Sequence, residues 1–264
     1  MTPTARSLGD HLREWRQRRR MSQLDLALEA DISQRHLSFI ESGRSTPSRE
    51  MLLHLAERLD VPLRDRNPLL LAAGFAPVFA ERKLDDPALE PARRAIDMVL
   101  KGHEPCPAIA IDRHWALIAA NAAITPLLEA VADESLLEPP INVLRLSLHP
   151  RGLAPQIANL PEWRAHLLDR LQQQISVSGD PVLETLLKDL LSYPAPESTG
   201  EAHADHAGIV VPLKLSTKAG LLSFISTTTV FGTPVDITLS ELAVESFFPA
   251  DQETAAILRS LALN

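Results

Sequence analysis

The sequence predicts two domains, an all-α N-terminal domain followed by an α+β domain with one antiparallel sheet. The chain has 264 residues, which is long for a single average domain. Helical patterns with polar caps fill the first part, whereas strand-like apolar runs flank helical segments in the rest. Charge divides the chain in the same way: residues 1–66 hold 12 Arg and 10 Asp or Glu, and the remainder is strongly acidic. Two segments with different electrostatics indicate two tasks.

The overall composition limits the class of protein. Net charge is −8 and 45% of residues are hydrophobic, which allows a sizeable core. No uninterrupted apolar run approaches the roughly 18 residues of a membrane span, and the first 20 residues are charged where a signal peptide is apolar. The single cysteine, Cys106, cannot form an intramolecular disulfide. We therefore expect a soluble, cytoplasmic protein without membrane association.

Two helices are expected at the start of the chain. Leu8, Leu12 and Trp15 recur at the spacing of one buried helical face. Ser22, followed three residues later by Asp25, forms a capping-box start for a second helix. The apolar face of that second helix is expected at Leu24, Ala27 and Leu28.

A third short helix follows after a turn of only two residues. Ser33 offers its N-cap, Leu37 and Ile40 face inward with Glu41 beside them, and Gly43 ends it. Two short helices joined by so tight a turn cannot lie antiparallel, so they predict a helix-turn-helix.

The outward face of the third helix carries side chains suited to base edges. At about 100° per residue, the positions facing away from Leu37 are Arg35, Ser38, Phe39 and Ser42, with Gln34 flanking them. Arg pairs with guanine, Gln with adenine, and an apolar ring can meet a thymine methyl group. A solvated helix face is the alternative, and Phe39 argues against it unless its ring packs against the following loop.

The stretch "SQLDLALEADISQRHLSFIESGRSTPSREMLLHLAERLDV" resembles the Xre/Cro-type helix-turn-helix family, over residues 8–73. The resemblance implies a five-helix domain with further helices near 48–59 and 63–73. It implies that Gln34, Arg35 and Phe39 read bases with help from Ser38, and that Gln23, Ser42 and Arg44 bind phosphates. Further phosphate contacts, or a solvated basic face, are expected of Arg13, Arg16, Arg18, Arg19 and Arg20.

Domain boundaries follow from composition. The N-terminal domain is expected over 1–75, a Gly/Pro-rich linker with a helix near 91–102 over 76–103, and the second domain over 104–264. Apolar runs at 107–111 and 115–120 around "DRH" predict a hairpin. Two strands around "TKAG" and a further strand in "SELAVESFF" follow later, with helices between.

"NVLRLSLHPRGLAPQIANLPEWRAHLLDRL" and "FGTPVDITLSELAVESFFPADQETAAIL" resemble the MmyB-like ligand-binding domain found behind such helix-turn-helix modules. The resemblance implies a PAS-like sheet with helices enclosing a pocket, and a small apolar carboxylate, similar to a fatty acid, as ligand.

Arginines are the main candidates for binding that carboxylate. Arg164 falls within the apolar stripe of a helix near 160–175, so its guanidinium needs a partner: a ligand carboxylate or an internal Asp or Glu. Arg145 likewise needs a partner for its guanidinium, and its segment could form either a helix or a strand. Further candidates are Trp163, His149 and Asn121, each of which could equally be a satisfied core or loop residue.

No pattern argues for catalysis. "HADHA" at 203–207 has too few spaced ligands for a metal site, and the sequence lacks a nucleophile elbow and a glycine-rich phosphate loop. We expect no catalytic residue, no metal and no cofactor other than the suspected ligand.

These observations predict a transcription regulator that binds a double-stranded DNA operator as a homodimer and is controlled by a ligand in its C-terminal domain. The alternative is a C-terminal domain that serves protein interaction or dimerisation without a ligand. An enzyme acting on a lipid or a small metabolite is the third and weakest reading.

Overall fold

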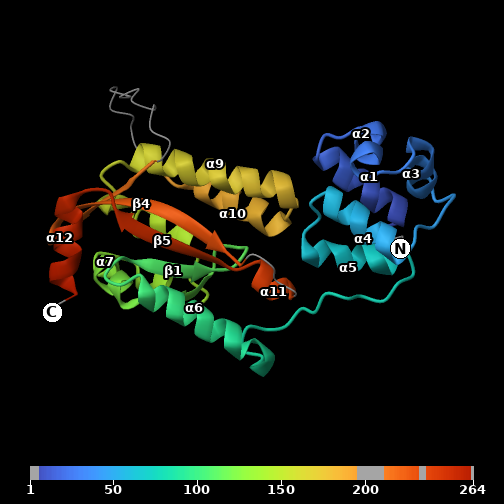
Figure 1. The fold of residues 1–264 in the computed structure, drawn as a ribbon. Helices are drawn as coiled ribbons and strands as arrows, with labels where there is room; N and C mark the ends of the chain where they lie inside the picture. Colours follow the sequence, from blue (N-terminus) through green and yellow to red (C-terminus); the bar gives the residue numbers. More distant parts are fainter. Residues whose placement is uncertain (1–5, 195–210, 232–235, 263–264) are drawn as a thin grey trace. The chain divides into compact units, whose positions relative to one another are not determined.

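The computed structural model describes residues 6–194, 211–231 and 236–262. These fall into two compact units (Figure 1). The first comprises Met1–Lys83, Ser176–Ser178 and Thr233–Ser240, and the second comprises Leu84–Ile175, Gly179–Gly232 and Glu241–Asn264.

The first unit contains the five helices that the sequence predicts: α1 (Leu8–Arg18), α2 (Gln23–Glu29), α3 (Gln34–Glu41), α4 (Arg49–Arg58) and α5 (Leu63–Ala72). Serines begin four of them, because the side chains of Ser7, Ser22, Ser33 and Ser48 each accept a hydrogen bond from a backbone N–H of the first turn. Gly43 follows α3 with φ of 73°, a conformation that glycine adopts without a side-chain clash.

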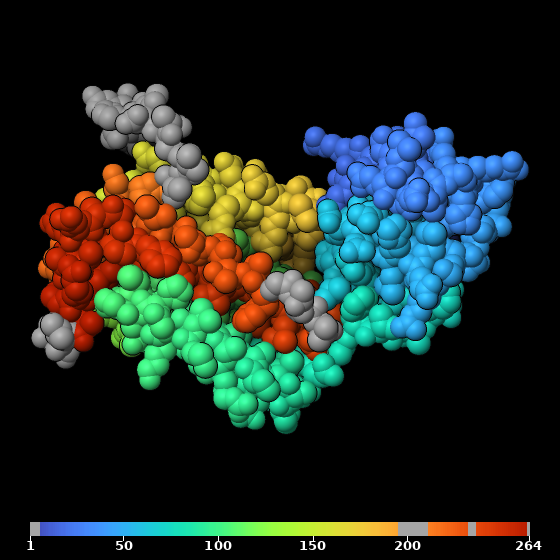
Figure 2. Space-filling model, viewed as in Figure 1, coloured from blue at the N-terminus to red at the C-terminus, as the bar shows by residue number. Residues whose placement is uncertain are grey.

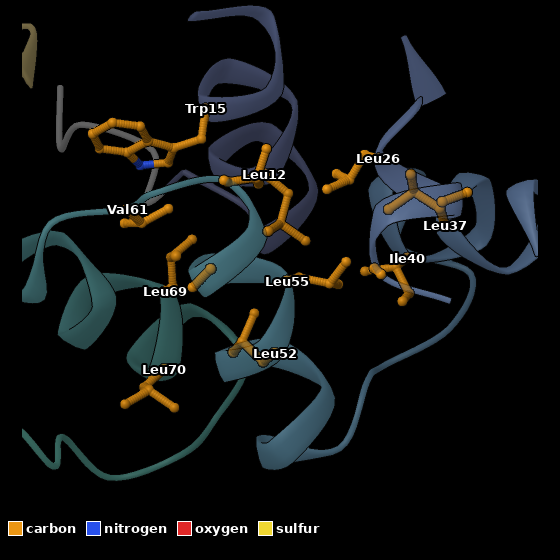
Figure 3. Packing of buried hydrophobic residues seen from close by; sticks show 14 residues of the cluster. Leu12, Trp15, Leu26, Leu37, Ile40, Leu52, Leu55, Val61, Leu69 and Leu70 are labelled. Carbon is orange, nitrogen blue, oxygen red and sulfur yellow. The ribbon is translucent and has the colours of Figure 1, made fainter. Parts of the chain in front are cut away.

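One aliphatic core joins these helices (Figure 3). Leu12 and Trp15 from α1 meet Leu37 and Ile40 from α3, as predicted, together with leucines of α4 and α5. The expected face of α2 is wrong in two of its three positions: Leu24 and Leu28 are 50% and 72% exposed. The buried side of α2 is instead formed by Leu26 and Ala27.

The segment after α5 continues the first unit. Phe75 and Phe79 pack against its core. The side chain of Asn67 holds the segment in place, because it donates to the backbone oxygen of Phe79 and accepts from the backbone N–H of Val78 and Phe79. Part of the stretch that the sequence marks as linker is therefore packed on the helical unit.

A short segment from much later in the chain also belongs to the first unit. Asp236 bridges to Ala80 in a parallel β-bridge, and the backbone N–H of Ile237 donates to the oxygen of Ala80 at 2.8 Å. The guanidinium of Arg82 lies 2.8 Å from the carboxylate of Asp236, whose side chain is almost fully buried. Helix α11 (Ile237–Ser240) begins at this point.

The second unit combines an antiparallel sheet with helices, as the sequence predicts. In the described residues the sheet has five strands in the order β2-β1-β5-β4-β3. The strands are β1 (Ala108–Ile111), β2 (Leu117–Ala120), β3 (Leu213–Thr217), β4 (Gly220–Val230) and β5 (Ala243–Pro249). The helices are α6 (Glu90–Gly102), α7 (Thr125–Leu128), α8 (Val143–Leu148), α9 (Leu160–Ser178), α10 (Pro181–Ser192) and α12 (Gln252–Leu261).

Helices cover the sheet of the second unit. The apolar stripe of α9 is buried as predicted, through Trp163, Leu167 and Leu171, in a core shared with β1 and β3. In the space-filling view α9 (yellow) lies directly against β4 (orange) (Figure 2). Leu258 of α12 packs against β4. Among the described residues no helix is both long and apolar enough to cross a membrane.

Candidate DNA-binding surface and ligand cavity

The N-terminal end of α3 presents two long polar side chains to solvent. Gln34 and Arg35 are the first two residues of the helix and both are exposed. Ser33 caps the helix through the backbone N–H of His36 at 3.2 Å. The start of an exposed helix, with Arg and Gln projecting from it, has the geometry needed to enter a major groove.

The ring of Phe39 contacts two guanidinium groups. The Arg35 guanidinium is 5.3 Å from the ring centroid and that of Arg44 is 5.9 Å away. The backbone N–H groups of Arg44 and Ser45 donate to the oxygen of Phe39 at 2.8 and 3.1 Å. The ring thus packs against the following loop, as one alternative expected, and it orients both arginines by cation–π contact.

The two serines of this face differ in accessibility. Ser38 is half-buried, whereas Ser42 is exposed and donates from its hydroxyl to the oxygen of Phe39 at 3.3 Å. Arg44 is also exposed. The residues predicted to contact DNA on and just after α3 therefore form one continuous surface: Gln34, Arg35, Ser38, Phe39, Ser42 and Arg44.

The side chain of Gln23, at the start of α2, contacts Glu41 at the end of α3. Its side-chain amide donates to Oε2 of Glu41 at 2.8 Å. Arg16 forms two hydrogen bonds to the same carboxylate, at 2.7 Å from Nε and 3.0 Å from Nη2. The hydrogen bond from Gln23 uses one of the two N–H donors of the amide group and fixes the orientation of the Gln23 side chain.

The Arg16–Glu41 pair is buried, and its charges stabilise one another. Burial alone would raise the pKa of Glu41, but hydrogen bonds from Arg16 and Gln23 outweigh it and lower the pKa. The hydrogen bond with Glu41 raises the pKa of Arg16 in turn. Arg16, which the sequence offered as a phosphate contact, is thus part of the support beneath α3.

Helix α1 approaches the end of α3 very closely. A Cβ atom on Gly9 would lie 2.1 Å from the backbone oxygen of Glu41, which is well inside van der Waals contact. Nη2 of Arg13 donates to the same oxygen at 3.0 Å. Glycine at this position allows α1 to fix the C-terminal end of α3.

The remaining arginines of the first helix have varied surroundings. Arg18 pairs with Glu14 at 2.7 Å, and Arg19 donates to the backbone oxygens of Leu59 and Asp60, both at 2.8 Å. Arg20 is exposed just after α1. Of Arg18, Arg19 and Arg20, Arg20 is therefore the most accessible to solvent.

The second unit contains an apolar cavity of about 110 Å³. Side chains from the sheet, α7, α8 and α9 line it: Ile109, Leu117, Ile124, Leu127, Leu128, Ile141, Val143, Leu146, Ser147, Leu153, Trp163, Leu167, Leu213, Leu215, Phe224, Glu245 and Phe247. Of the predicted ligand-binding residues, Trp163 lines this cavity. Its indole N–H donates to the hydroxyl of Ser147 at 3.1 Å.

A charged pair lies at the wall of the cavity. Glu245 is 5% exposed, and its Oε1 lies 2.6 Å from the guanidinium of Arg170. Thr228, which faces Glu245 across the β4–β5 ladder, donates to the same oxygen at 3.4 Å. Arg170 also stacks over the ring of Trp115, 4.8 Å from its centroid. Burial, followed by the charge of Arg170, lowers the pKa of the neighbouring His166.

Glu245 and Arg170 are absent from the sequence-based candidates. The alternation of "AVESFF" places Glu245 and Phe247 on the same face of one strand. From this alternation the sequence could have indicated that an acidic residue lies on the inner face of the sheet.

Arg164 is buried, as its position predicts, and its protein partners are backbone oxygens, not the Asp or Glu of the internal ion pair that was the alternative. Its guanidinium donates to the backbone oxygens of Leu190, Tyr193 and Pro194, each at 3.1 Å, and of Leu191 at 3.4 Å. These oxygens belong to the end of α10 and the residues after it, which lack helical partners. Arg164 therefore acts as a cap for α10.

The other predicted ligand-binding residues lie outside the cavity lining. Arg145 is on helix α8, not on a strand, and pairs with Asp189 at 2.7 Å. Asn121 is buried and bonds to the backbone of Leu100, Cys106 and Ala108.

His149 accepts a hydrogen bond from the backbone N–H of Arg151 at 3.1 Å and makes an edge-to-face contact with Tyr193. Like Asn121, His149 has protein partners that account for its position.

Metal and thiol chemistry receive no support from the described residues. "HADHA" at 203–207 lies outside them, and within them no group of His, Cys, Asp and Glu is arranged to hold a metal. Burial raises the pKa of the Cys106 thiol, which disfavours its nucleophilic thiolate form.

Comparisons with known proteins match both units. Residues 12–65 match the family model described as helix-turn-helix, and residues 92–261 match the model described as MmyB-like transcription regulator ligand binding domain. The second description names a transcription regulator, and neither description names an enzyme. No curated protein matches the chain.

Among the solved structures that match is one described as an RNA-binding light-oxygen-voltage receptor, with 13% identity and a TM-score of 0.26. The match covers 98% of this chain and 65% of that chain, so this chain spans less than two thirds of the other's length. Similarity this low carries no argument about fold or function.

Proposed function

Because the chain belongs to the family of transcription regulators with an MmyB-like ligand-binding domain, we propose that it binds a specific DNA operator through α3 and that a small apolar ligand in the cavity of the second unit controls this binding. The observation that carries the DNA-binding part is the continuous surface of Gln34, Arg35, Phe39 and Arg44 on a helix-turn-helix. The cation–π contacts of Phe39 with Arg35 and Arg44 reduce the freedom of both guanidinium groups before they meet DNA.

Base reading and phosphate contact are assigned to different residues. Arg35 and Gln34 project from the start of α3 and would pair with base edges, with the half-buried Ser38 beside them. Gln23, Ser42 and Arg44 lie around the helix and would bind phosphates, which fix register. As in many helix-turn-helix proteins, a homodimer would read two half-sites about one helical turn apart.

The ligand-binding part rests on the apolar cavity. A buried apolar space with few polar groups is the usual form of a small-molecule site. The predicted carboxylate headgroup, as in a fatty acid, stays a prediction, since Arg145 and Arg164 have protein partners elsewhere.

The chain connects the cavity walls to the DNA-binding unit. Strands β4 and β5 contribute Phe224, Glu245 and Phe247 to the cavity. Between these strands the chain passes through Asp236–Ser240, which belong to the first unit through the Arg82–Asp236 pair. We propose that a ligand changes DNA affinity by shifting β4 and β5 and thereby this segment, which requires the ligand to favour one of two arrangements.

Selection of duplexes from a random pool by the purified full-length chain tests this function. We expect enrichment of a motif with approximate two-fold symmetry, and a lower specificity of Arg35→Ala at one position in each half-site. Arg58→Ala, an exposed arginine at the end of α4, is the matched control and should select the same motif. Recovery of unenriched sequences would overturn the proposal.

A further inference from the structure

The walls of the apolar cavity carry one ionisable side chain among the residues that line it, the carboxylate of Glu245. We infer that the ligand is a compact apolar molecule with an uncharged hydroxyl group, which donates a hydrogen bond to Glu245. This inference rests on the proposed function, because it names the class of ligand for the same cavity.

The hydrogen bonds of Glu245 leave room for a donor. Oε1 receives Arg170 at 2.6 Å and Thr228 at 3.4 Å. Among the described residues, no hydrogen bond to Oε2 is found. A carboxylate can accept several hydrogen bonds. Since no fully buried side-chain oxygen of the described residues lacks a partner, Oε2 keeps some accessible surface through which a further donor can reach it. A ligand hydroxyl that enters the cavity would satisfy Oε2.

The charge of the site selects against ionic headgroups. A carboxylate would face Glu245 in a low-dielectric environment, where like charges repel strongly. A cationic headgroup would leave an uncompensated positive charge in the cavity, since Arg170 already neutralises the charge of Glu245. An uncharged donor adds a hydrogen bond without adding a charge.

Volume limits the apolar part of the ligand. An apolar cavity of roughly 150 Å³ accommodates one benzene molecule, and this cavity measures about 110 Å³. A long acyl chain would require the surrounding side chains to move apart. A single ring needs only a small widening of the cavity, and phenol adds one strong donor to such a ring, so it is a suitable probe.

Calorimetric titration of the full-length chain with phenol, benzene, benzylamine, benzoate and decanoate tests the inference. We expect phenol to bind about tenfold more tightly than benzene, the difference made by one hydrogen bond to a charged acceptor. Benzylamine, benzoate and decanoate should bind more weakly than phenol. Tighter binding of benzoate, decanoate or benzylamine than of phenol would overturn the inference.

Variants of Glu245 test whether the hydroxyl group of the ligand binds to this residue. In Glu245→Gln the preference for phenol over benzene should fall to about threefold or less, since a neutral amide oxygen is a weaker acceptor. The double variant Arg170→Met with Glu245→Gln avoids an unpaired buried arginine and should show the same loss. Glu184→Gln, an exposed acidic residue of α10, is the matched control and should keep the preference. An unchanged preference in both Glu245 variants would contradict the assignment.

The same protein preparation separates this inference from the proposed function. If no probe binds while the chain still selects a DNA motif, the ligand inference fails and the DNA-binding function stands. If phenol binds but no DNA motif is selected, the ligand class is supported and the regulator proposal fails.

Discussion

The side-chain amide of Gln23 and the carboxylate of Glu41 lie 2.8 Å apart, and this hydrogen bond links the start of α2 to the end of α3. Glu41 accepts from Arg16 at the same time. The surface that we assign to DNA is therefore supported by a buried polar network, and its members have separable roles.

Gln23→Ala should weaken binding to the selected duplex and to a scrambled duplex by the same factor, about three- to tenfold. The reason is that Gln23 would contact a phosphate, which carries no sequence information. Fluorescence anisotropy with both duplexes measures this. Unchanged affinity for both duplexes would restrict Gln23 to a structural role.

Glu41→Gln should lower the free energy of unfolding of the first unit by about 3 kcal/mol, because it leaves the mostly buried Arg16 without its counter-charge. Hydrogen exchange of α1 and α3 amides in the full chain reports this locally. Glu50→Gln, an exposed residue of α4, is the control and should change little. Equal exchange in the two variants would show that the pair contributes nothing.

The same pair predicts a pH dependence. The pKa of Glu41 is lowered in the folded state from an ordinary value of 4.5. Its contribution to stability is therefore fully present above that value and is lost as pH falls through the lowered pKa. The difference in stability between the wild type and Glu41→Gln should shrink as pH falls below 4.5. A difference that stays constant over this range would contradict the assignment.

Arg164→Ala should destabilise the second unit by about 3 kcal/mol, because it removes the guanidinium hydrogen bonds to four backbone oxygens at and after the end of α10. Arg145→Ala, whose pair with Asp189 is largely exposed, should cost about 0–1 kcal/mol. Chemical unfolding monitored for the second unit compares the two. If both variants instead bind ligand more weakly at unchanged stability, the earlier expectation of carboxylate binding is correct.

Asp236→Asn should remove the effect of a bound ligand on DNA affinity while leaving phenol binding itself unchanged. Asn at this position cannot form the ion pair with Arg82, so the segment between β4 and β5 is less firmly bound to the first unit. Anisotropy with and without phenol measures the coupling. A coupling equal to that of the wild type would exclude this route.

Local signals made much of the fold predictable. Capping serines, the glycine after α3 and alternating strands are read within a few residues, and each is found where it is expected. The apolar face of α2 was not predictable, because seven residues offer two overlapping stripes and only the packing against α3 and α4 selects Leu26 and Ala27.

The partners of charged residues were harder to predict than their burial. Arg164 is buried as its helical position indicates, but its acceptors are backbone oxygens 26 to 30 residues away. Backbone acceptors have no sequence signature. Likewise, the Arg170–Glu245 pair joins a helix to a strand far along the chain, and its place at the cavity wall follows from the tertiary structure.

The ratio of affinities for the selected duplex and a scrambled duplex, measured at low and at physiological salt, tests the central claim most directly. If α3 reads base edges, the ratio for the wild type should be about a thousand or more and should persist as salt weakens both affinities. In Arg35→Ala the free-energy difference between the two duplexes should be smaller by about 1–3 kcal/mol. A wild-type ratio near one at both salt concentrations would contradict the account.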